Sequence, residues 1–286
     1  MTNPISSVNR RNDWLFRGLG ILATGLGLAT LLLLLGALLW DGLQRLDGAF
    51  LTTGASRFAE KAGILPALVG TGWLMILTAL LAIPVGVGAG VYLEEYGNNN
   101  RFAAFLEINI NNLAGVPSVI YGLLGLQVFS RGLHLGASFM AGALTLSLLI
   151  LPVIIVSTRE ALKTVPASIR EASYALGATR WQTIYQQVLP AAGSGVLTGI
   201  ILALSRAIGE TAPLIVLGAK VFVSTPHSPF DPYTVLPLQI YNWISRPQTA
   251  YFTNAAAAII ILLLITFLLN GMAIYLRNRW NHQANG

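Results

Sequence analysis

Long windows without Asp, Glu, Lys or Arg recur along the chain and limit what it can fold into. The hydrocarbon core of a bilayer is about 30 Å thick, and a helix crosses it in roughly 20 residues. Because unpaired backbone groups are not tolerated in lipid, and the windows are too long for barrel strands, we expect an all-α integral membrane protein with six transmembrane helices. The candidate spans are Leu19–Trp40, Leu65–Leu93, Ile108–Ser130, Gly132–Thr158, Pro190–Ala219 and Thr253–Leu276, of which only the fifth carries charged residues, Arg206 and Glu210.

The composition supports a membrane protein and excludes several functions. Hydrophobic residues make up 55% of the 286 residues and charged residues only 10%, whereas a soluble domain carries about a quarter charged residues. The net charge of +6 comes from basic residues scattered between apolar spans, so we expect contact with membrane lipid and no nucleic-acid partner. The sequence has no cysteine, no Walker-type phosphate loop, no HExxH pair and no GxSxG elbow. We therefore expect no enzyme activity, no metal ligands and no cofactor bound by this chain.

The chain divides into three segments. Residues 1–64 hold the first span and an outer loop, residues 65–277 form a core of five spans, and residues 278–286 are a tail. The first apolar run is too long for a signal peptide and lacks a cleavage site, so it is interpreted as an uncleaved span. With the amino terminus inside, the inside segments carry more Lys and Arg than the outside ones, which predicts that both termini are cytoplasmic.

Small residues within the spans predict close helix packing. The pairs Gly86/Gly90 and Gly195/Gly199 have the small-xxx-small spacing that lets membrane helices approach each other. A short turn at residues 131–136 separates the third and fourth spans, which predicts an antiparallel hairpin. Four further residues are candidates for packing or hinge positions: Pro117, Gly122, Gly209 and Pro213.

The loop at residues 159–189 is long, polar and predicted to be cytoplasmic. Pro166 suits the first turn of a short helix, Gly177 can cap its end, and a second helix is expected to begin near Thr179. One face of the first helix is apolar and can enter a groove on a partner protein, although an ordinary surface helix would have the same pattern. That face consists of Ile169, Ala172, Ala175 and Leu176.

The same loop contains a sequence that resembles a known family. Glu171-Ala172-Ser173, then Gly177 and later Leu189-Pro190, resemble the EAA loop of type I ABC importer permeases. Within that group the sequence is similar to the PstA-type permeases of phosphate importers, and the resemblance extends from about Leu65 to Arg277. It is carried by three further stretches, Ala114–Gly122, Ser205–Leu214 and Leu236–Trp243.

The resemblance implies a permease subunit in the plasma membrane of a prokaryote. Its implied partners are a PstC-like sister permease, two PstB-like ATPase subunits that carry the ATP and Mg²⁺, and a PstS-like phosphate-binding protein on the outer face. The implied contact with the ATPase is the loop helix, including Ile169, Arg170, Glu171, Ala172, Leu176 and Gly177.

Arg206 and Glu210 are the candidate residues of the translocation path. A charge at mid-bilayer costs about 2.5 to 3.5 kcal/mol on the insertion scale, so both residues should face a bundle interior or water. They are four residues apart and are expected to pair on one helix face. Arg206 can offer its guanidinium to a passing oxyanion, or the pair can clamp the helix to a neighbour.

Other functions stay open on sequence grounds. Importers of molybdate, tungstate or sulfate have permeases of the same general plan. A secondary transporter would also have charges within its spans, but the chain shows no internal repeat. A channel is disfavoured because there is no filter motif or arginine ladder.

Overall fold

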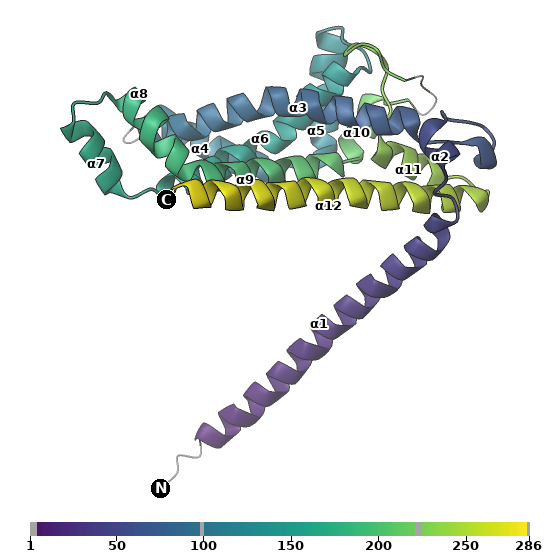
Figure 1. The fold of residues 1–286 in the computed structure, drawn as a ribbon, viewed down its shortest axis with the longest axis horizontal. Coiled ribbons are helices and arrows are strands. Elements are labelled where there is room, and N and C mark those ends of the chain that lie inside the picture. Colours follow the sequence, from purple (N-terminus) through teal and green to yellow (C-terminus); the bar gives the residue numbers. More distant parts are fainter. Residues whose placement is uncertain (1–4, 98–99, 221–222, 224, 285–286) are drawn as a thin grey trace.

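The computed structural model describes residues 5–97, 100–220, 223 and 225–284, and this part of the chain contains helices and no sheet (Figure 1). Five helical segments are long and apolar enough to cross a membrane: Asn12–Leu43, Leu65–Tyr96, Phe139–Lys163, Arg180–Ile208 and Ala250–Met272. A sixth span is formed when the bent pair Arg101–Ala114 and Ser118–Gly132 is taken as one. The expected all-α membrane fold is therefore confirmed.

The elements follow one another along the chain with short connections. The long helices are α1 (Ile5–Leu43), α3 (Leu65–Val91), α4 (Arg101–Ala114), α6 (Phe139–Lys163), α9 (Leu189–Ile208) and α12 (Ala250–Ala284). The shorter ones are α2 (Gly48–Thr52), α5 (Ser118–Gly125), α7 (Ala167–Ala175), α8 (Arg180–Thr183), α10 (Ala212–Leu217) and α11 (Leu236–Ile244). A 3₁₀ turn, η1 (Ala59–Lys61), and three π-helical segments, η2 (Tyr92–Tyr96), η3 (Leu126–Gly132) and η4 (Ile184–Val188), complete the list.

The third predicted span is not one straight helix. α4 and α5 are bent by 107° at the break between Ala114 and Ser118. Pro117 precedes α5 with φ −56° and ψ 138°, and a proline disfavours helical geometry in the residue before it. The Tyr121 hydroxyl donates a hydrogen bond of 2.8 Å to the Leu113 carbonyl. This bond satisfies one of the carbonyls that the break leaves without a helical partner.

The fourth and fifth spans also differ from the prediction. α6 begins at Phe139 and not at Gly132, because Ser138 caps it by accepting a hydrogen bond from the Ala141 N–H. The fifth span ends at Ile208, and a separate helix, α10, follows the break at residues 209–211. At its other end the span starts early, because α8, η4 and α9 run on as one helical segment from Arg180. The second loop helix is therefore the beginning of the fifth span.

α6 is the centre of the bundle. Two thirds (67%) of its most apolar window is buried, against 28% for the spans containing α3, α9 and α12. Gly86 and Gly90 of α3 lie against Ile154 and Thr158, and a β-carbon on either glycine would come within 2.7 Å of those side chains. A β-carbon on Gly195 of α9 would likewise come within 2.8 Å of the Ala161 side chain. The predicted small-xxx-small packing is confirmed at these contacts.

α1 stands apart from the rest of the bundle. No residue of its most apolar window is buried, and Figure 1 shows it diverging from the other helices. It meets α12 near its carboxyl end, where a β-carbon on Gly42 would lie 2.8 Å from the Ala256 backbone.

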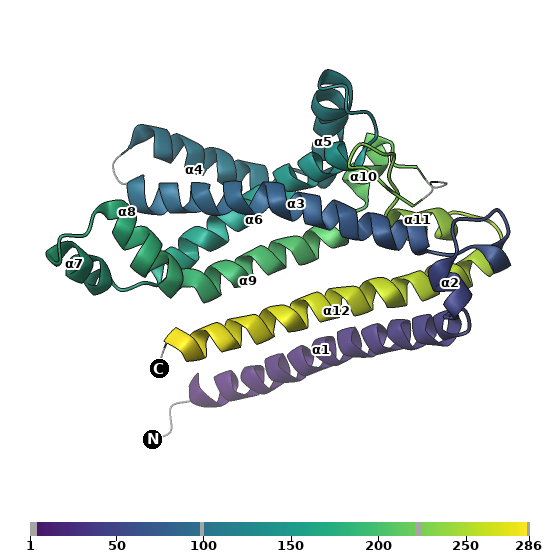
Figure 2. The same ribbon diagram turned by 45° about the horizontal axis from the view of Figure 1, so that its top comes forward.

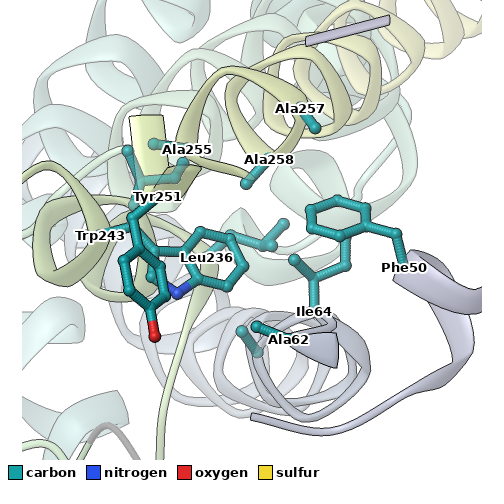
Figure 3. Close-up of a cluster of buried hydrophobic side chains, with 11 residues drawn as sticks. Phe50, Ala62, Ile64, Leu236, Trp243, Tyr251, Ala255, Ala257 and Ala258 are labelled. Carbon is teal, nitrogen blue, oxygen red and sulfur yellow. The ribbon is translucent and has the colours of Figure 1, made fainter. Parts of the chain in front are cut away.

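The two ends of the molecule differ in structure. Figure 2 shows both termini and the α7–α8 loop at one end of the bundle, with α2 and α11 at the other. At the second end a buried cluster joins α2, α11 and α12 through Phe50, Ile64, Leu236, Trp243 and Tyr251 (Figure 3). Arg45 strengthens this cap by donating to Asp47, to Asn254 and to the Glu60 and Ala62 carbonyls.

Candidate functional site

The candidate coupling helix, α7, lies beyond the end of the bundle, between Pro166 and a glycine turn at its carboxyl end. The sequence predicts Pro166 in the first turn, and the structure has it one position earlier, as the residue immediately before the helix. After Ala175 the chain turns at Gly177, whose φ is +81°. The Gly177 N–H donates to the Tyr174 carbonyl and the Ala178 N–H to the Ser173 carbonyl, which is the Schellman arrangement. The predicted glycine cap is confirmed.

The next helix begins where the sequence predicts. The Thr179 hydroxyl accepts a hydrogen bond from the Gln182 N–H, and the Gln182 side chain accepts one from the Thr179 N–H. This reciprocal capping box starts α8. The Ser173 and Thr183 hydroxyls are 2.8 Å apart and join α7 to α8, so the two helices form one folded loop.

The residues of α7 have two different roles in packing. Ile169 is partly buried and packs on the cluster that includes Leu162, Val165 and Val188. Ala172 and Ala175 are exposed, and 89% of Leu176 is exposed. The apolar face therefore divides: Ile169 holds α7 to its own chain, and the end at Leu176 is open to a partner.

The two charged residues next to each other in α7 also differ. Arg170 points back to the bundle, where its guanidinium donates to Glu95 and to the Val165 and Leu162 carbonyls. The hydrogen bond to the Glu95 carboxylate raises the pKa of Arg170 above its ordinary value. Glu171 is exposed, and within the described residues its side chain makes no hydrogen bond or ion pair. Arg170 anchors the helix and Glu171 is available to another protein.

The intramembrane charge pair forms, although not on one helix. The Arg206 Nε lies 3.5 Å from the Glu210 Oε1. Arg206 is in the last turn of α9, but Glu210 follows the end of that helix at Gly209. The Arg206 side chain is 51% exposed and that of Glu210 is 18% exposed. The guanidinium therefore opens onto the surface of this chain at the break in the fifth span.

Two of the four candidate hinge residues lie at the helix breaks, and the other two lie in the short helices that follow them. Pro117 is at the α4–α5 break and Gly209 at the α9–α10 break. Gly122 of α5 packs on Pro213 of α10, where a β-carbon on the glycine would be 2.7 Å from the Pro213 Cα. The sequence prediction placed these residues within two straight spans, and the structure brings the two broken spans together.

Three exposed asparagines were missed by the sequence analysis. Asn109, Asn111 and Asn112 lie on α4, within the third predicted span, and all three are exposed. Amide side chains are unfavourable toward hydrocarbon, so this surface of α4 suits a protein partner or a water-filled path. The signal was present in the sequence as three asparagines among four consecutive residues, 109–112, of an apolar window.

No metal centre accompanies these sites within the described residues. The described part of the chain contains no group of three or more His, Asp or Glu side chains that could hold a metal ion.

Comparison with known proteins places this architecture in a family. A sequence model of the family described as "Binding-protein-dependent transport system inner membrane component" matches residues 82–282, which include α7 and both helix breaks. The chain belongs to this family of transport permeases. The expected localisation in a prokaryotic plasma membrane is thereby confirmed, and a secondary transporter or channel is set aside.

Relatives of this permease are similar along most of their length. The phosphate transport system permease protein PstA of Haemophilus influenzae is 35% identical over 91% of this chain and 92% of its own. PstA 1 of Mycobacterium tuberculosis strain H37Rv is 37% identical over 75% of this chain and 70% of its own. The probable ABC transporter permease YqgI of Bacillus subtilis is 31% identical over 91% and 94% of the two chains. The resemblance to PstA-type permeases is confirmed.

Solved structures support the fold alone. A chain of a bacterial ABC transporter involved in alginate import superposes with a TM-score of 0.66 at 18% identity, covering 95% of this permease and 97% of that chain. A chain of the MetNI methionine ABC transporter, in an inward-facing conformation, gives 0.59 at 19% identity, covering 76% and 94%. The type I importer permease fold is confirmed.

Proposed function

We propose that this permease is a subunit of an ATP-driven phosphate importer and forms the translocation path with a sister permease. The relatives named PstA support phosphate as the substrate. The observation that carries coupling is the position of α7, which presents Glu171 and the exposed Leu176 beyond the end of the bundle. A helix that packs on its own chain at one side and is exposed at the other can bind in a groove on a second protein.

Membership of the binding-protein-dependent permease family supports the proposed partners. Two cytoplasmic ATPase subunits bind ATP and Mg²⁺, and one of them holds α7 in a surface groove. A phosphate-binding protein delivers substrate at the opposite end, where α2, α11 and α12 pack around a buried apolar cluster. Closure of the ATPase subunits moves α7, and the bundle changes between outward-open and inward-open states.

Arg206 is the proposed contact for phosphate. A half-exposed guanidinium at a helix break would be costly toward lipid, so we place it on the path shared with the sister permease. Its planar donors match phosphate oxygens. Glu210 competes for the same donors, which keeps the anion from binding too tightly to leave.

Phosphate uptake tests the proposed substrate. Cells that lack their own phosphate importers and express the assembled complex should accumulate radiolabelled phosphate in an ATP-dependent manner. Excess unlabelled phosphate should suppress the signal, whereas molybdate, tungstate and sulfate should not. Accumulation of labelled molybdate, tungstate or sulfate, with no accumulation of labelled phosphate, would assign the permease to that substrate instead.

Arg206→Gln separates the two roles of the charge pair. If Arg206 contacts phosphate, losing a charged hydrogen-bond donor worth about 1.5–3 kcal/mol should lower uptake by roughly tenfold or more at an unchanged amount of complex. Arg206→Lys keeps the charge without the planar arrangement of donors. Its phosphate uptake should lie between that of the unchanged permease and that of Arg206→Gln. Normal uptake by Arg206→Gln, with a lower thermal stability, would identify the pair as a clamp.

A further inference from the structure

Two consecutive carboxylates at the end of the second span hold arginines from two different elements. Glu94 and Glu95 lie in η2, the π-helical continuation of α3. Glu95 binds Arg170 of α7, and Glu94 binds Arg159 near the end of α6. This end of α3 is therefore a junction between the loop helix and the bundle.

The contact between Glu95 and Arg170 is close and shielded. The Arg170 Nη2 is 2.6 Å from the Glu95 Oε1, and the Arg170 Nε is 3.2 Å from the same oxygen. Only 6% of the Glu95 side chain and 21% of the Arg170 side chain are exposed. Because Arg170 also donates to the Leu162 and Val165 carbonyls, α7 is tied to the ends of both α3 and α6. A partly buried, charge-assisted pair of this kind holds its geometry better than a surface pair.

Arg159 extends the connection to α4. Its Nη1 lies 2.8 Å from the Glu107 Oε1, and its Nε lies 3.5 Å from the Glu94 Oε2. Only 15% of the Arg159 side chain is exposed. α4 packs on the bundle through Ala103, Leu106 and Ile110, and Glu107 adds an ion pair to these apolar contacts. α4 then leads directly to the break at Pro117.

We propose that Arg170, Glu95, Glu94, Arg159 and Glu107 form an ion-pair linkage through which displacement of α7 moves the end of α3 and the helix α4. The inference rests on the proposed function of α7 as the coupling helix, and it adds four positioning residues outside α7. Without the linkage α7 could tilt under the ATPase while α4 and its break stayed in place. With it, the three elements move as one body.

The linkage predicts loss of coupling and not loss of ATP hydrolysis. The assembled complex is reconstituted in liposomes, and radiolabelled phosphate uptake and ATP hydrolysis are measured in the same vesicles. Glu95→Gln should keep ATP hydrolysis and lower the phosphate moved per ATP by about fivefold or more, the usual size of an allosteric coupling. The double variant Glu95→Arg with Arg170→Glu exchanges the two charges and restores an ion pair. It should therefore recover part of the lost phosphate transport per ATP.

The matched control is the exposed pair at the same end of α6. Lys163 Nζ lies 2.8 Å from Glu160 Oε1, with 45% and 64% of the two side chains exposed. Glu160→Gln removes an ion pair without touching the linkage and should leave the ratio unchanged. A wild-type ratio in Glu95→Gln would overturn the proposal. If Glu95→Gln does not assemble, Glu107→Gln decides, because 46% of that side chain is exposed and its loss cuts only the tie to α4.

A distance measurement distinguishes failure of the linkage from failure of the proposed substrate. Spin labels at Ser168→Cys on α7 and Ile108→Cys on α4 report whether the helices move together when ATP binds. The distance between the two labels should be the same with and without ATP in the otherwise unchanged chain. In Glu107→Gln it should change when ATP binds. A separation that changes equally in both would overturn the linkage, whatever substrate the vesicles transport.

Discussion

The contact between Gly122 and Pro213 sets how closely the two broken spans approach each other. Both residues are buried, and the glycine has room for a hydrogen atom only, because a β-carbon would be 2.7 Å from the Pro213 Cα and 2.9 Å from its carbonyl oxygen. Backbone atoms cannot rotate away as a flexible side chain can. The position therefore excludes every larger residue unless α5 and α10 separate.

Gly122→Ala tests this contact. Overpacking of this kind costs about 1–3 kcal/mol, and thermal unfolding of the purified permease in detergent should show a lower midpoint. Gly88→Ala on α3 is the matched control, since a β-carbon there would have open space around it. Equal midpoints for Gly122→Ala and the control would mean that α5 and α10 are not in this contact.

Leu176→Ser tests the open end of α7. Since 89% of Leu176 is exposed, the substitution should leave the unfolding midpoint unchanged. If the side chain enters a groove on the ATPase, its loss should weaken binding of the ATPase subunits by about tenfold, or about 1.4 kcal/mol, measured by titration of detergent-solubilised permease. Ile169→Ser should lower the midpoint instead, because Ile169 packs on its own chain. Undiminished ATPase binding by Leu176→Ser would remove this residue from the interface.

At the scale of the elements, α7 depends on the left-handed residue that ends it. Gly177 has φ +81°, and a β-carbon would meet nothing within 4 Å, so only the backbone conformation restricts this position. Gly177→Ala should cost about 1–2 kcal/mol. Gly177→Asn should cost less, because asparagine tolerates this conformation. Hydrogen exchange of the α7 amides, followed by mass spectrometry, should be fastest in Gly177→Ala, and identical exchange in all three proteins would contradict the role of the cap.

The sequence was sufficient for the loop and insufficient for the breaks, for physical reasons. Pro166, Gly177 and Thr179 act on their immediate neighbours, so their effects could be predicted locally. Gly209 and Pro213 were candidates for packing or hinge positions, but their residue types did not predict that the helix ends there, because Gly and Pro are common within membrane helices that stay continuous. Glu95 and Arg170 are 75 residues apart in the chain, and a single sequence offers no means to pair them. The ion-pair linkage therefore needed the structure.

At the scale of the whole molecule, the termini and the candidate coupling loop share one end of the bundle (Figure 2). Six crossings bring both termini to the same side, which agrees with the bent α4–α5 pair being one span. No residue in the most apolar window of α1 is buried within this chain, so that surface is available to lipid or to the sister permease. The geometry fixes which segments lie together, and the excess of Lys and Arg near the termini predicts that they are cytoplasmic.

Labelling of single cysteines tests that orientation directly, because the chain has no cysteine of its own. Ser168→Cys on α7 and Thr52→Cys at the opposite end are both exposed positions. A membrane-impermeant maleimide should label Thr52→Cys in intact cells, and Ser168→Cys only after the cells are permeabilised. The control is the same pair in permeabilised cells, where both should react fully. Reaction of Ser168→Cys in intact cells would place α7 outside, beyond the reach of any cytoplasmic ATPase, and coupling through α7 would be impossible.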